Sequence, residues 1–591
     1  MSARANIRWV KPPAFLVAVA GLIGIIGIGM TIVGSQTTGV STDEPGHVRR
    51  INNYLESGLY IRTFEVRQTP PGQIPTGAYV YGPVTSLFQH DVQRLLDTEP
   101  GFTAKTRGHH YAIRHAVIAG FALLGLLAAA GTAWLILGNW RWGVITAGIL
   151  SATPLWTGHA MFNMKDTPVA VGHTLITFAL VLLALAKPSS RHVTILAGAG
   201  TFAVGTILML GTRPGAWPSL MGSLIVFAAI VVLARKALTR THILRVATAV
   251  VVGLVASYLV LRAVYPRVFG DLAQALYMSA FGSAHYDGLG KQSPSDRSYL
   301  LVHALIDLPL GLVGLMLTGT LVTAYLWLVQ RRRSVHLDCI ALVGSQTFAL
   351  MAAAVILDSN LYHGLRQMLF AIPTLAVLAT IGLAALLTIA PTGRLRLAVA
   401  IGGCLAMILP TAAQAAMFPY QYSYINVAAE QAGVNPNEDY FGMSFREYAH
   451  VDPQDVKITC PFMRLGYVVY RETEPDCRTR FAHTFSAYWR GRPTPDRPKK
   501  PGEFYTILRG SRPTPPNCEI HRQVERWRNL EKTVMSRMFV CHHPTRQEVL
   551  EGITILNRAQ QRNGFKLFWP EYLGERPKSG PGSLASLKEE S

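Results

Sequence analysis

The sequence predicts an α-helical polytopic membrane protein with about eleven transmembrane helices and a C-terminal soluble domain of α/β or α+β type. The first observation is the composition: 50% of the 591 residues are hydrophobic and only 15% are charged, which is less charge than soluble globular proteins carry. The second is the distribution, because apolar runs of about 20 residues recur up to residue 416 and then stop. The last third is rich in Arg, Pro and Tyr, as expected for a water-facing domain.

The expected spans follow one another closely along the first two thirds of the chain. They are 13–34, 115–137, 142–160, 167–187, 192–211, 217–234, 246–265, 300–330, 339–357, 368–390 and 397–416. The 300–330 run is longer than a bilayer requires, so we expect either a tilted helix or a re-entrant start.

The basic residues of the loops predict the orientation of these spans. Arg4, Arg8 and Lys11 precede the first span and place the N-terminus in the cytoplasm. The even-numbered connections then lie on the same side, and they carry Arg141, Lys187, Arg191, Arg235, Lys236, Arg240, Arg245, Arg331, Arg332, Arg333, Arg394 and Arg396. An odd number of spans places the C-terminal domain outside. A cleaved signal peptide is the alternative for the first run, but the run is long for one and lacks an evident small-x-small cleavage site.

Three segments are therefore expected. Residues 1–416 form the transmembrane module, 417–576 an extracytoplasmic soluble domain, and 577–591 a disordered tail. An exported location favours two disulfides among four cysteines of the soluble domain, and we expect the sequential pairs Cys460–Cys477 and Cys518–Cys541 out of three possible connectivities. Four buried thiols are the alternative. Cys339 and Cys404 lie in apolar runs and are expected to be packing residues.

The formal net charge of +21 does not indicate nucleic-acid binding, because it is divided among short loops and the tail and no recognisable binding module is present. The chain also contains no Walker loop, Rossmann fingerprint, His-Glu-x-x-His or Cys-x-x-Cys pair, so nucleotide or zinc chemistry lacks support in the sequence.

Acidic residues stand at the outer ends of two predicted spans. Asp43 and Glu44 follow the first span and precede a predicted helix that contains His47. Thr42 or Asp43 can also be a simple helix cap. Lys165 and Asp166 stand where the fourth span begins, in a loop that also contains His159 and Asn163; an interfacial ion pair is the alternative there, although ionisable residues at a membrane boundary often serve a site.

Two arginines in the outer loops depart from the positive-inside pattern. Arg213 lies between the fifth and sixth spans, and Arg366 follows His363 before the tenth. The planar guanidinium group suits phosphate oxygens and stays charged in a partly dry site. A lipid-linked phosphate is therefore the expected partner, and snorkelling to lipid headgroups is the alternative.

In this pattern the chain resembles the glycosyltransferase C superfamily, which uses polyprenyl-phosphate sugars, and especially its branch of protein O-mannosyltransferases and lipid A aminoarabinose transferases. The resemblance rests on Asp43-Glu44 after the first span and Asp166 at the fourth, and it covers residues 1–416 in architecture. Further segments are similar to a bacterial subgroup of such enzymes: Tyr79–Pro83, Arg114-His115, Phe162–Asp166, Pro419–Asn426 and Asp439–Glu447. Unlike the best-known O-mannosyltransferases, this chain lacks a large inserted central domain.

The resemblance implies roles for individual residues. Asp43 would be the general base or a ligand of a divalent cation, Mg or Mn, and Asp166 would support the metal or the acceptor, with Glu44 as a weaker candidate for either role. On chemical grounds we also expect Lys165, Arg213, His363 and Arg366 to bind the donor phosphate, and His47, His159 and Asn163 to bind the acceptor or to support the site. These expectations agree with general chemistry, because an acceptor hydroxyl needs a carboxylate within reach and a leaving phosphate needs cations.

The predicted function is hexosyl or pentosyl transfer from a polyprenyl-phosphate donor to an extracytoplasmic protein, lipid or cell-envelope glycan, in a bacterial inner or plasma membrane. A polytopic transporter is one alternative, but no internal repeat is evident and the acids lie at span ends rather than at mid-membrane. A membrane scaffold without glycosyl transfer is the other.

Overall fold

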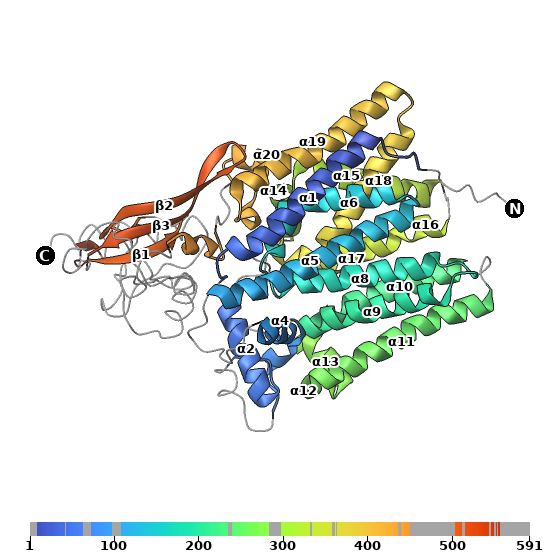
Figure 1. Ribbon diagram of the computed structural model, residues 1–591, viewed down its shortest axis with the longest axis horizontal. Helices are drawn as coiled ribbons and strands as arrows, with labels where there is room; N and C mark the ends of the chain where they lie inside the picture. The colour runs from blue at the N-terminus through green and yellow to red at the C-terminus, as the bar shows by residue number, and fades with distance from the viewer. Residues whose placement is uncertain are drawn as a thin grey trace.

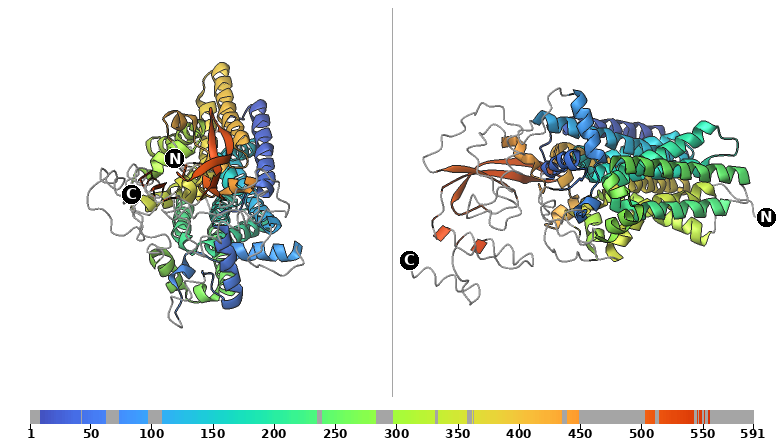
Figure 2. Two further views of the ribbon diagram at one scale, coloured as in Figure 1. Left: turned by 90° about the vertical axis from the view of Figure 1, so that its left-hand side faces the viewer. Right: turned by 90° about the horizontal axis from the view of Figure 1, so that it is seen from below.

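The computed structural model describes residues 9–41, 43–62, 73–96, 108–234, 239–282, 297–330, 334–356, 361, 363–434, 439–448, 503–510, 514–542, 545, 547–548, 551 and 554–555. It is an elongated helical bundle with a small sheet that projects from one end, whereas the first helix, α1, begins at the other end (Figures 1 and 2). We call the first of these the sheet-bearing end.

Ten helical segments in the described part of the chain are long and apolar enough to cross a membrane, so the protein is an integral membrane protein. Their helices are α1 (Ala14–Thr37), α5 (Gly108–Leu137), α8 (Asp166–Leu185), α9 (His192–Thr212), α10 (Trp217–Ala234), α11 (Arg240–Val264), α15 (Leu310–Ala324), α17 (Ile340–Ile356), α18 (Ile372–Ile389) and α19 (Gly393–Met417). Four of them are extended by the short helices η2 (Pro214–Ala216), η6 (Tyr325–Val329), α16 (Val335–Asp338) and η7 (Gly364–Ala371).

The predicted span 142–160 is not one continuous helix. It consists of α6 (Trp140–Ser151) and α7 (Pro154–Ala160), separated by Thr153 in an extended conformation. A residue before proline is disfavoured in the helical region, and proline itself suits the first turn of a helix, so Pro154 ends one helix and starts the next. The two pieces still carry the chain from the end of α5 back to the start of α8 (Figure 1).

The long predicted span 300–330 is also divided by a proline. Leu308 is extended before Pro309, so α14 (Tyr299–Asp307) ends there and α15 begins. The membrane-crossing segment is the second part, Leu310–Val329, whereas α14 packs against η7 at the sheet-bearing end.

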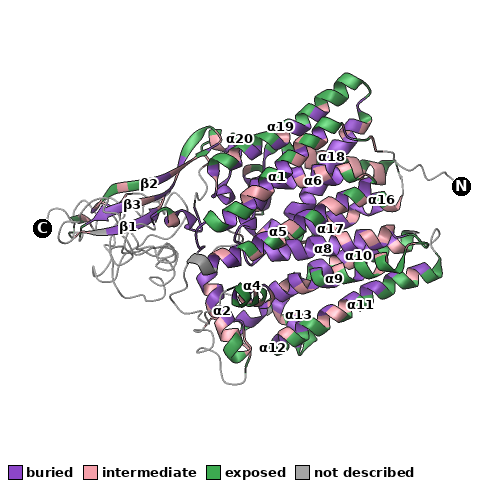
Figure 3. Ribbon diagram, viewed as in Figure 1, coloured by how far each residue is buried: buried purple, intermediate pink, exposed green. Residues whose placement is uncertain are grey.

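The helices α8 and α18 form the centre of the bundle, and lipid-facing surface lies on the outer helices. Most of α8 and nearly all of α18 are buried, whereas the exposed faces belong to helices such as α11 and α19 (Figure 3). Polar groups in the interior are paired between helices: Thr146 Oγ1 and Thr380 Oγ1 are 2.8 Å apart, and Gln346 Nε2 donates to the Phe370 carbonyl at 2.7 Å. Such pairing is needed where water is excluded.

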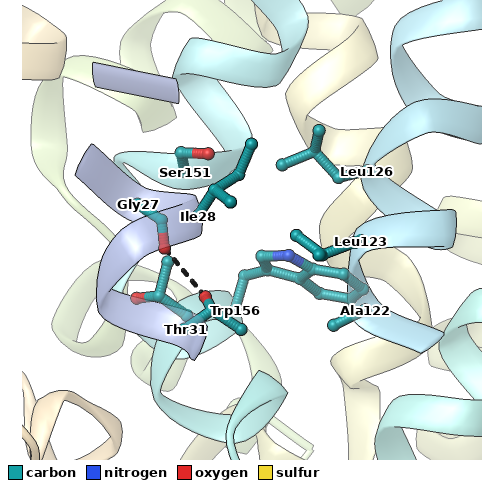
Figure 4. Close-up of a pocket in the computed structure, with 9 residues that line it drawn as sticks. Gly27, Ile28, Thr31, Ala122, Leu123, Leu126, Ser151 and Trp156 are labelled. Carbon is teal, nitrogen blue, oxygen red and sulfur yellow. Dashed lines mark hydrogen bonds between the residues drawn. The ribbon is translucent and has the colours of Figure 1, made fainter. Parts of the chain in front are cut away.

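A narrow crevice with almost no room for a water molecule lies where the α6–α7 break faces α1 and α5. Trp156 lies between Thr31 of α1 and Leu123 of α5, and the Thr31 hydroxyl donates to the Gly27 carbonyl (Figure 4). No charged residue lines this crevice. It is therefore distinct from the charged site described below.

The remaining described elements lie at the sheet-bearing end. They are α2 (Glu44–Ser57), η1 (Thr76–Tyr79), α4 (Val84–Leu96), α12 (Pro266–Phe269), α13 (Leu272–Tyr277), η4 (Met278–Gly282), η8 (Gln421–Ser423), α20 (Val427–Gln431), η9 (Met443–Tyr448), β1 (Phe504–Arg509), β2 (Cys518–Arg528) and β3 (Glu531–Cys541). The strands form an antiparallel sheet in the order β1-β3-β2.

The expected disulfide Cys518–Cys541 is confirmed, and it joins the outer ends of β2 and β3, where the two residues are register partners. Cys339 and Cys404 are free and buried, as expected for packing residues. The other predicted pair, Cys460–Cys477, and the predicted tail 577–591 lie outside the described residues.

Candidate functional site

Asp43 lies between α1 and α2, where its carboxylate contacts two cations. Lys165 Nζ is 2.8 Å from Asp43 Oδ2, and Arg366 Nη2 contacts the same oxygen. Asp43 stands at the N-cap position of α2, but it has helical backbone angles and its side chain makes no capping hydrogen bond, so the alternative of a simple side-chain cap does not hold for this residue. Its side chain is 34% exposed, so the carboxylate can be reached from outside the protein.

Asp166 opens α8 and is almost fully enclosed by polar partners. Arg213 Nη2 lies 2.8 Å from Asp166 Oδ1, and Arg366 Nε lies 3.2 Å from Oδ2. Asn163 Nδ2 also donates to Oδ2, at 2.9 Å. The side chain of Asp166 is only 3% exposed, which fits a residue that positions two arginines better than one that meets a substrate.

Arg366 connects the two carboxylates, since it contacts both Asp43 and Asp166, and its guanidinium carbon lies 4.4 Å from the centre of the Phe441 ring. A guanidinium group presents several donors in one plane, so one side chain can serve both acids.

The turn that carries Arg366 has an unusual backbone. His363 and Gly364 both have positive φ angles, 58° and 64°. Two side chains of α14 accept hydrogen bonds from the amide groups of this turn. Gly364 N–H donates to the Tyr299 hydroxyl and Leu365 N–H donates to Asp307 Oδ2, each at 2.9 Å. A side chain at position 364 would collide with Asp307, so glycine is needed there.

The ring of Tyr81 lies among three cations at the edge of this cluster. Its centre is 5.0 Å from the Arg50 guanidinium carbon, 5.5 Å from that of Arg213 and 5.9 Å from Lys165 Nζ. His47 packs edge-on against the same ring at 5.3 Å. The segment is attached to the end of α9, because Gly82 N–H donates to the Thr212 carbonyl at 2.9 Å.

A hydrogen-bonded chain connects Asp166 with the C-terminal part of the protein. Asn163 Oδ1 accepts from the Asp166 amide, which fixes its side-chain amide so that Nδ2 donates to His159 Nδ1 at 3.0 Å. A neutral imidazole that accepts at Nδ1 carries its proton at Nε2, so His159 donates to the Tyr440 hydroxyl at 3.0 Å. Tyr440 also stacks on His363, with ring centres 4.6 Å apart.

Glu44 binds elsewhere. Its Oε1 lies 2.7 Å from His115 Nε2, and its Oε2 accepts from the Ser41 amide at 2.6 Å. This carboxylate therefore joins α2 to α5, which is a structural position, and of the two neighbouring acids it is Asp43 that meets the cations.

The cluster has an excess of positive charge, because Lys165, Arg213 and Arg366 surround the two carboxylates of Asp43 and Asp166. Burial alone would raise the pKa of Asp43, but Lys165 and Arg366 outweigh it and hold this pKa well below its usual range.

The pKa values of the two histidines beside the cluster are lowered as well, which favours their uncharged form. Burial, Arg50 and Lys165 lower the pKa of His47, and burial with Arg366 and Arg509 lowers that of His363, both to well below the usual value. Both rings are therefore neutral at physiological pH.

The donor set does not fit the predicted divalent cation. Among the described residues, no group of three or more His, Cys, Asp or Glu side chains is placed to hold a metal ion. Asp43 and Asp166 contact Lys165, Arg213 and Arg366, so a divalent ion at their oxygens would face three positive charges at short range.

No protein-family model and no curated protein matches this chain. Among solved structures, ArnT from Cupriavidus metallidurans bound to undecaprenyl phosphate aligns with 88% of this chain and 97% of its own, at 12% identity and a TM-score of 0.46. The same protein in the apo state gives equal coverage, 13% identity and a TM-score of 0.45. The Archaeoglobus fulgidus oligosaccharyltransferase in complex with Zn and sulfate aligns with 82% of this chain and 58% of its own, at 14% identity and a TM-score of 0.40. All three alignments have identities below 15% and TM-scores below 0.5.

The structure brings together most of the predicted site residues and adds others. Asp43, Lys165, Asp166, Arg213 and Arg366 form one cluster, and its neighbours include His47, Asn163, His159 and His363. Sequence reasoning gave no role to Arg50, Tyr81, Tyr440 or Phe441, although the last three stand in segments on which the resemblance rests. Their aromatic character was the available signal, but a membrane-interface belt explains aromatic residues equally well.

Proposed function

We propose that this protein is a membrane glycosyltransferase that moves a sugar from a polyprenyl-phosphate donor to a hydroxyl group of a protein, lipid or cell-envelope glycan. The observation that carries the proposal is the composition of the cluster: the partly exposed carboxylate of Asp43 contacts Lys165 and Arg366 where membrane-spanning helices end, and Arg213 contacts the neighbouring Asp166. A lipid-linked phosphate has its charge at this depth and its chain in the bilayer.

In this proposal Lys165, Arg213 and Arg366 hold the phosphate. The bond between the anomeric carbon and the phosphate oxygen breaks, and the electron pair leaves with the lipid phosphate. A new bond forms between the anomeric carbon and the acceptor oxygen, and the hydroxyl proton passes to Asp43. The three cations stabilise the charge that develops on the phosphate, which is the type of electrostatic stabilisation that usually contributes most to catalysis.

Asp166 has a positioning role. Its carboxylate is buried against Arg213 and Arg366 and so fixes both guanidinium groups without meeting the substrate. The ring face of Tyr81 helps to orient Lys165 and Arg213.

The proposal places the sheet-bearing end outside the cytoplasm. The basic residues Arg141, Lys187, Arg191, Arg394 and Arg396 flank helix ends at the other end of the bundle, as expected for a cytoplasmic face. The disulfide Cys518–Cys541 at the sheet-bearing end supports the same orientation, because such bonds persist in oxidising compartments.

The test is incubation of the purified protein in lipid nanodiscs with a panel of undecaprenyl-phosphate sugars, both hexoses and pentoses. We expect at least one donor to release undecaprenyl phosphate, and the variant Arg366→Gln to lose this activity. Asp91→Asn is the control for a charge change, because Asp91 lies exposed on α4.

A transporter or scaffold would give a different result. No turnover of any donor, together with equal undecaprenyl-phosphate binding by wild type and Arg366→Gln, would overturn the proposed function.

A further inference from the structure

The turn between β2 and β3 exposes large apolar side chains. Trp527 is 52% exposed and Leu530 is 59% exposed, and they flank Asn529, whose positive φ of 52° makes the tight turn. Lys532 Nζ lies 5.8 Å from the centre of the Trp527 ring. We call residues 527–532 the hairpin tip.

The hairpin tip is attached to the chain that leaves the last membrane-spanning helix. α19 ends at Met417, and Arg526 Nε donates to the Phe418 carbonyl at 3.1 Å. Asn529 Nδ2 donates to the Ile425 carbonyl at 2.8 Å, and Leu530 N–H donates to Glu430 Oε2 at 3.2 Å. Figure 1 shows the hairpin reaching back from the sheet to α20, beside the end of α19.

Exposed apolar side chains also lie on the two helices next to the tip. Leu405, Ile408 and Leu409 are exposed on α19, and Val427 is exposed on α20, the helix that the tip contacts through Glu430. Leu409 precedes Met417 by eight residues, a rise of about 12 Å along the helix axis, so the helix end stands near the boundary of the hydrocarbon layer.

We propose that the hairpin tip is an interfacial anchor that lies in the lipid headgroup layer, on the side of the membrane that carries the sheet. Tryptophan is enriched at this depth because its ring is apolar and its N–H is polar. Lysine extends its charge from there toward water and phosphate. Hydrogen bonds to Phe418, Ile425 and Glu430 hold the tip beside the end of the last span, and this position identifies the bilayer as its occupant.

The anchor would fix the sheet over the charged cluster. The strand β3 binds the segment that carries Tyr440, because Ser536 Oγ lies 2.7 Å from Ser444 Oγ and the Tyr448 hydroxyl donates to the Ser536 carbonyl at 3.0 Å. A tip held in the headgroups thereby restrains Tyr440 beside His159 and His363.

The strand itself offers a matched control position. Ile520 is 49% exposed and apolar like Leu530, but it lies near the disulfide end of β2, roughly 20 Å before Trp527 along the strand. The two positions therefore have similar exposure in the protein and differ in distance from the membrane.

The experiment is an accessibility measurement on the full chain in lipid nanodiscs. A spin label is attached at position 530, 520 or 409 through p-acetylphenylalanine, which leaves the six cysteines in place. At each position the rate at which the spin label collides with oxygen, which concentrates in lipid, is divided by its collision rate with nickel-EDDA, which stays in water. We expect the oxygen-to-nickel ratio at 530 to exceed that at 520 severalfold and to approach the lipid-facing reference at 409.

Either of two results would overturn the proposal. Equal ratios at 530 and 520 would place the tip in water. Shielding of position 530 from both reagents would mean that protein covers the tip, and dipolar broadening between labels would identify that protein as a second copy of the chain.

Discussion

At the scale of single residues, Asp43 and Asp166 differ in exposure although both are carboxylates that contact Arg366. Asp43 is 34% exposed and Asp166 only 3%. The accessible residue suits proton transfer and the buried one suits positioning. If the proposed function is correct, the same contacts make Asp43 a competitor of the substrate, because Lys165 and Arg366 would hold either its carboxylate or a donor phosphate.

The first prediction concerns the variant Asp43→Asn. Turnover should fall by about 10²- to 10⁴-fold, the usual contribution of a general base. Binding of undecaprenyl phosphate should nevertheless become tighter by roughly tenfold, about 1.4 kcal/mol, because the cations lose a competing anion. Calorimetry or a lipid-binding assay in nanodiscs would measure this, with Asp91→Asn as control. Weaker binding by Asp43→Asn would contradict the competition.

The second prediction concerns the ionisation of Tyr81. Burial would raise the pKa of this phenol, but Lys165, Arg213 and Arg50 together lower it below 10.0. As pH rises through this lowered pKa, a negative charge appears among the cations, so phosphate binding should weaken below the pH at which an ordinary tyrosine ionises.

A titration of lipid-phosphate affinity from about pH 7 to about pH 11 would measure this effect. The variant Tyr81→Phe cannot ionise and should keep its affinity to higher pH. If both proteins lose affinity at the same pH, Tyr81 is not the titrating group. Asp43 and His363 should contribute little near neutrality, because the pKa values of both are held well below their usual ranges.

At the scale of elements, α7 is positioned by a close backbone contact. A Cβ atom at Gly158 would lie 2.3 Å from the backbone nitrogen of Tyr422, so α7 and η8 meet where only glycine fits. The neighbouring residue is His159, which joins Asn163 to Tyr440. The break at Pro154 therefore allows a short helix to carry a site residue that a straight span would place differently.

The third prediction follows from this contact. Gly158→Ala should lower the free energy of unfolding by about 1–3 kcal/mol, the usual cost of overpacking, and should reduce turnover by displacing His159. Gly120→Ala in α5 is the matched control, since an added Cβ there meets no atom within 4 Å. Thermal unfolding in nanodiscs with parallel activity assays would separate the two variants. Equal stability of both would show that α7 can move away from η8.

At the scale of the whole molecule, the charged cluster is assembled from segments far apart in sequence. Asp43 follows α1, Asp166 begins α8, Arg213 follows α9 and Arg366 lies in η7, yet all meet at the sheet-bearing end. The C-terminal segment is part of the same assembly, because Tyr440 and Phe441 contact His159, His363 and Arg366.

The fourth prediction is the orientation of this assembly in the membrane. Alkaline phosphatase fused after Ser591 should be active, and green fluorescent protein fused at the same position should not fluoresce. The reason is that the sheet-bearing end is proposed to lie outside the cytoplasm. Fusion after Lys187, between α8 and α9, should give the reverse pattern. The opposite result for both fusions would invert the proposed topology.

The sequence predicted correctly those structural features that depend on the properties of a single short stretch of chain. Apolar length identified the spans, except at 142–160 and 300–330, where Pro154 and Pro309 divide the chain. Both prolines are visible in the sequence. Whether such a residue kinks one helix or separates two depends on the groups that bind the freed backbone, and these come from other segments.

The amino-acid sequence predicts a membrane bundle followed by a C-terminal soluble domain, with acids and arginines in the outer loops, because hydrophobic length and loop charge are local properties. Which acid meets the cations depends on the tertiary structure. Asp43 and Glu44 are neighbours, yet one contacts Lys165 and Arg366 and the other His115. Successive side chains at the start of a helix point in different directions, so the packing of distant helices selects the partner of each.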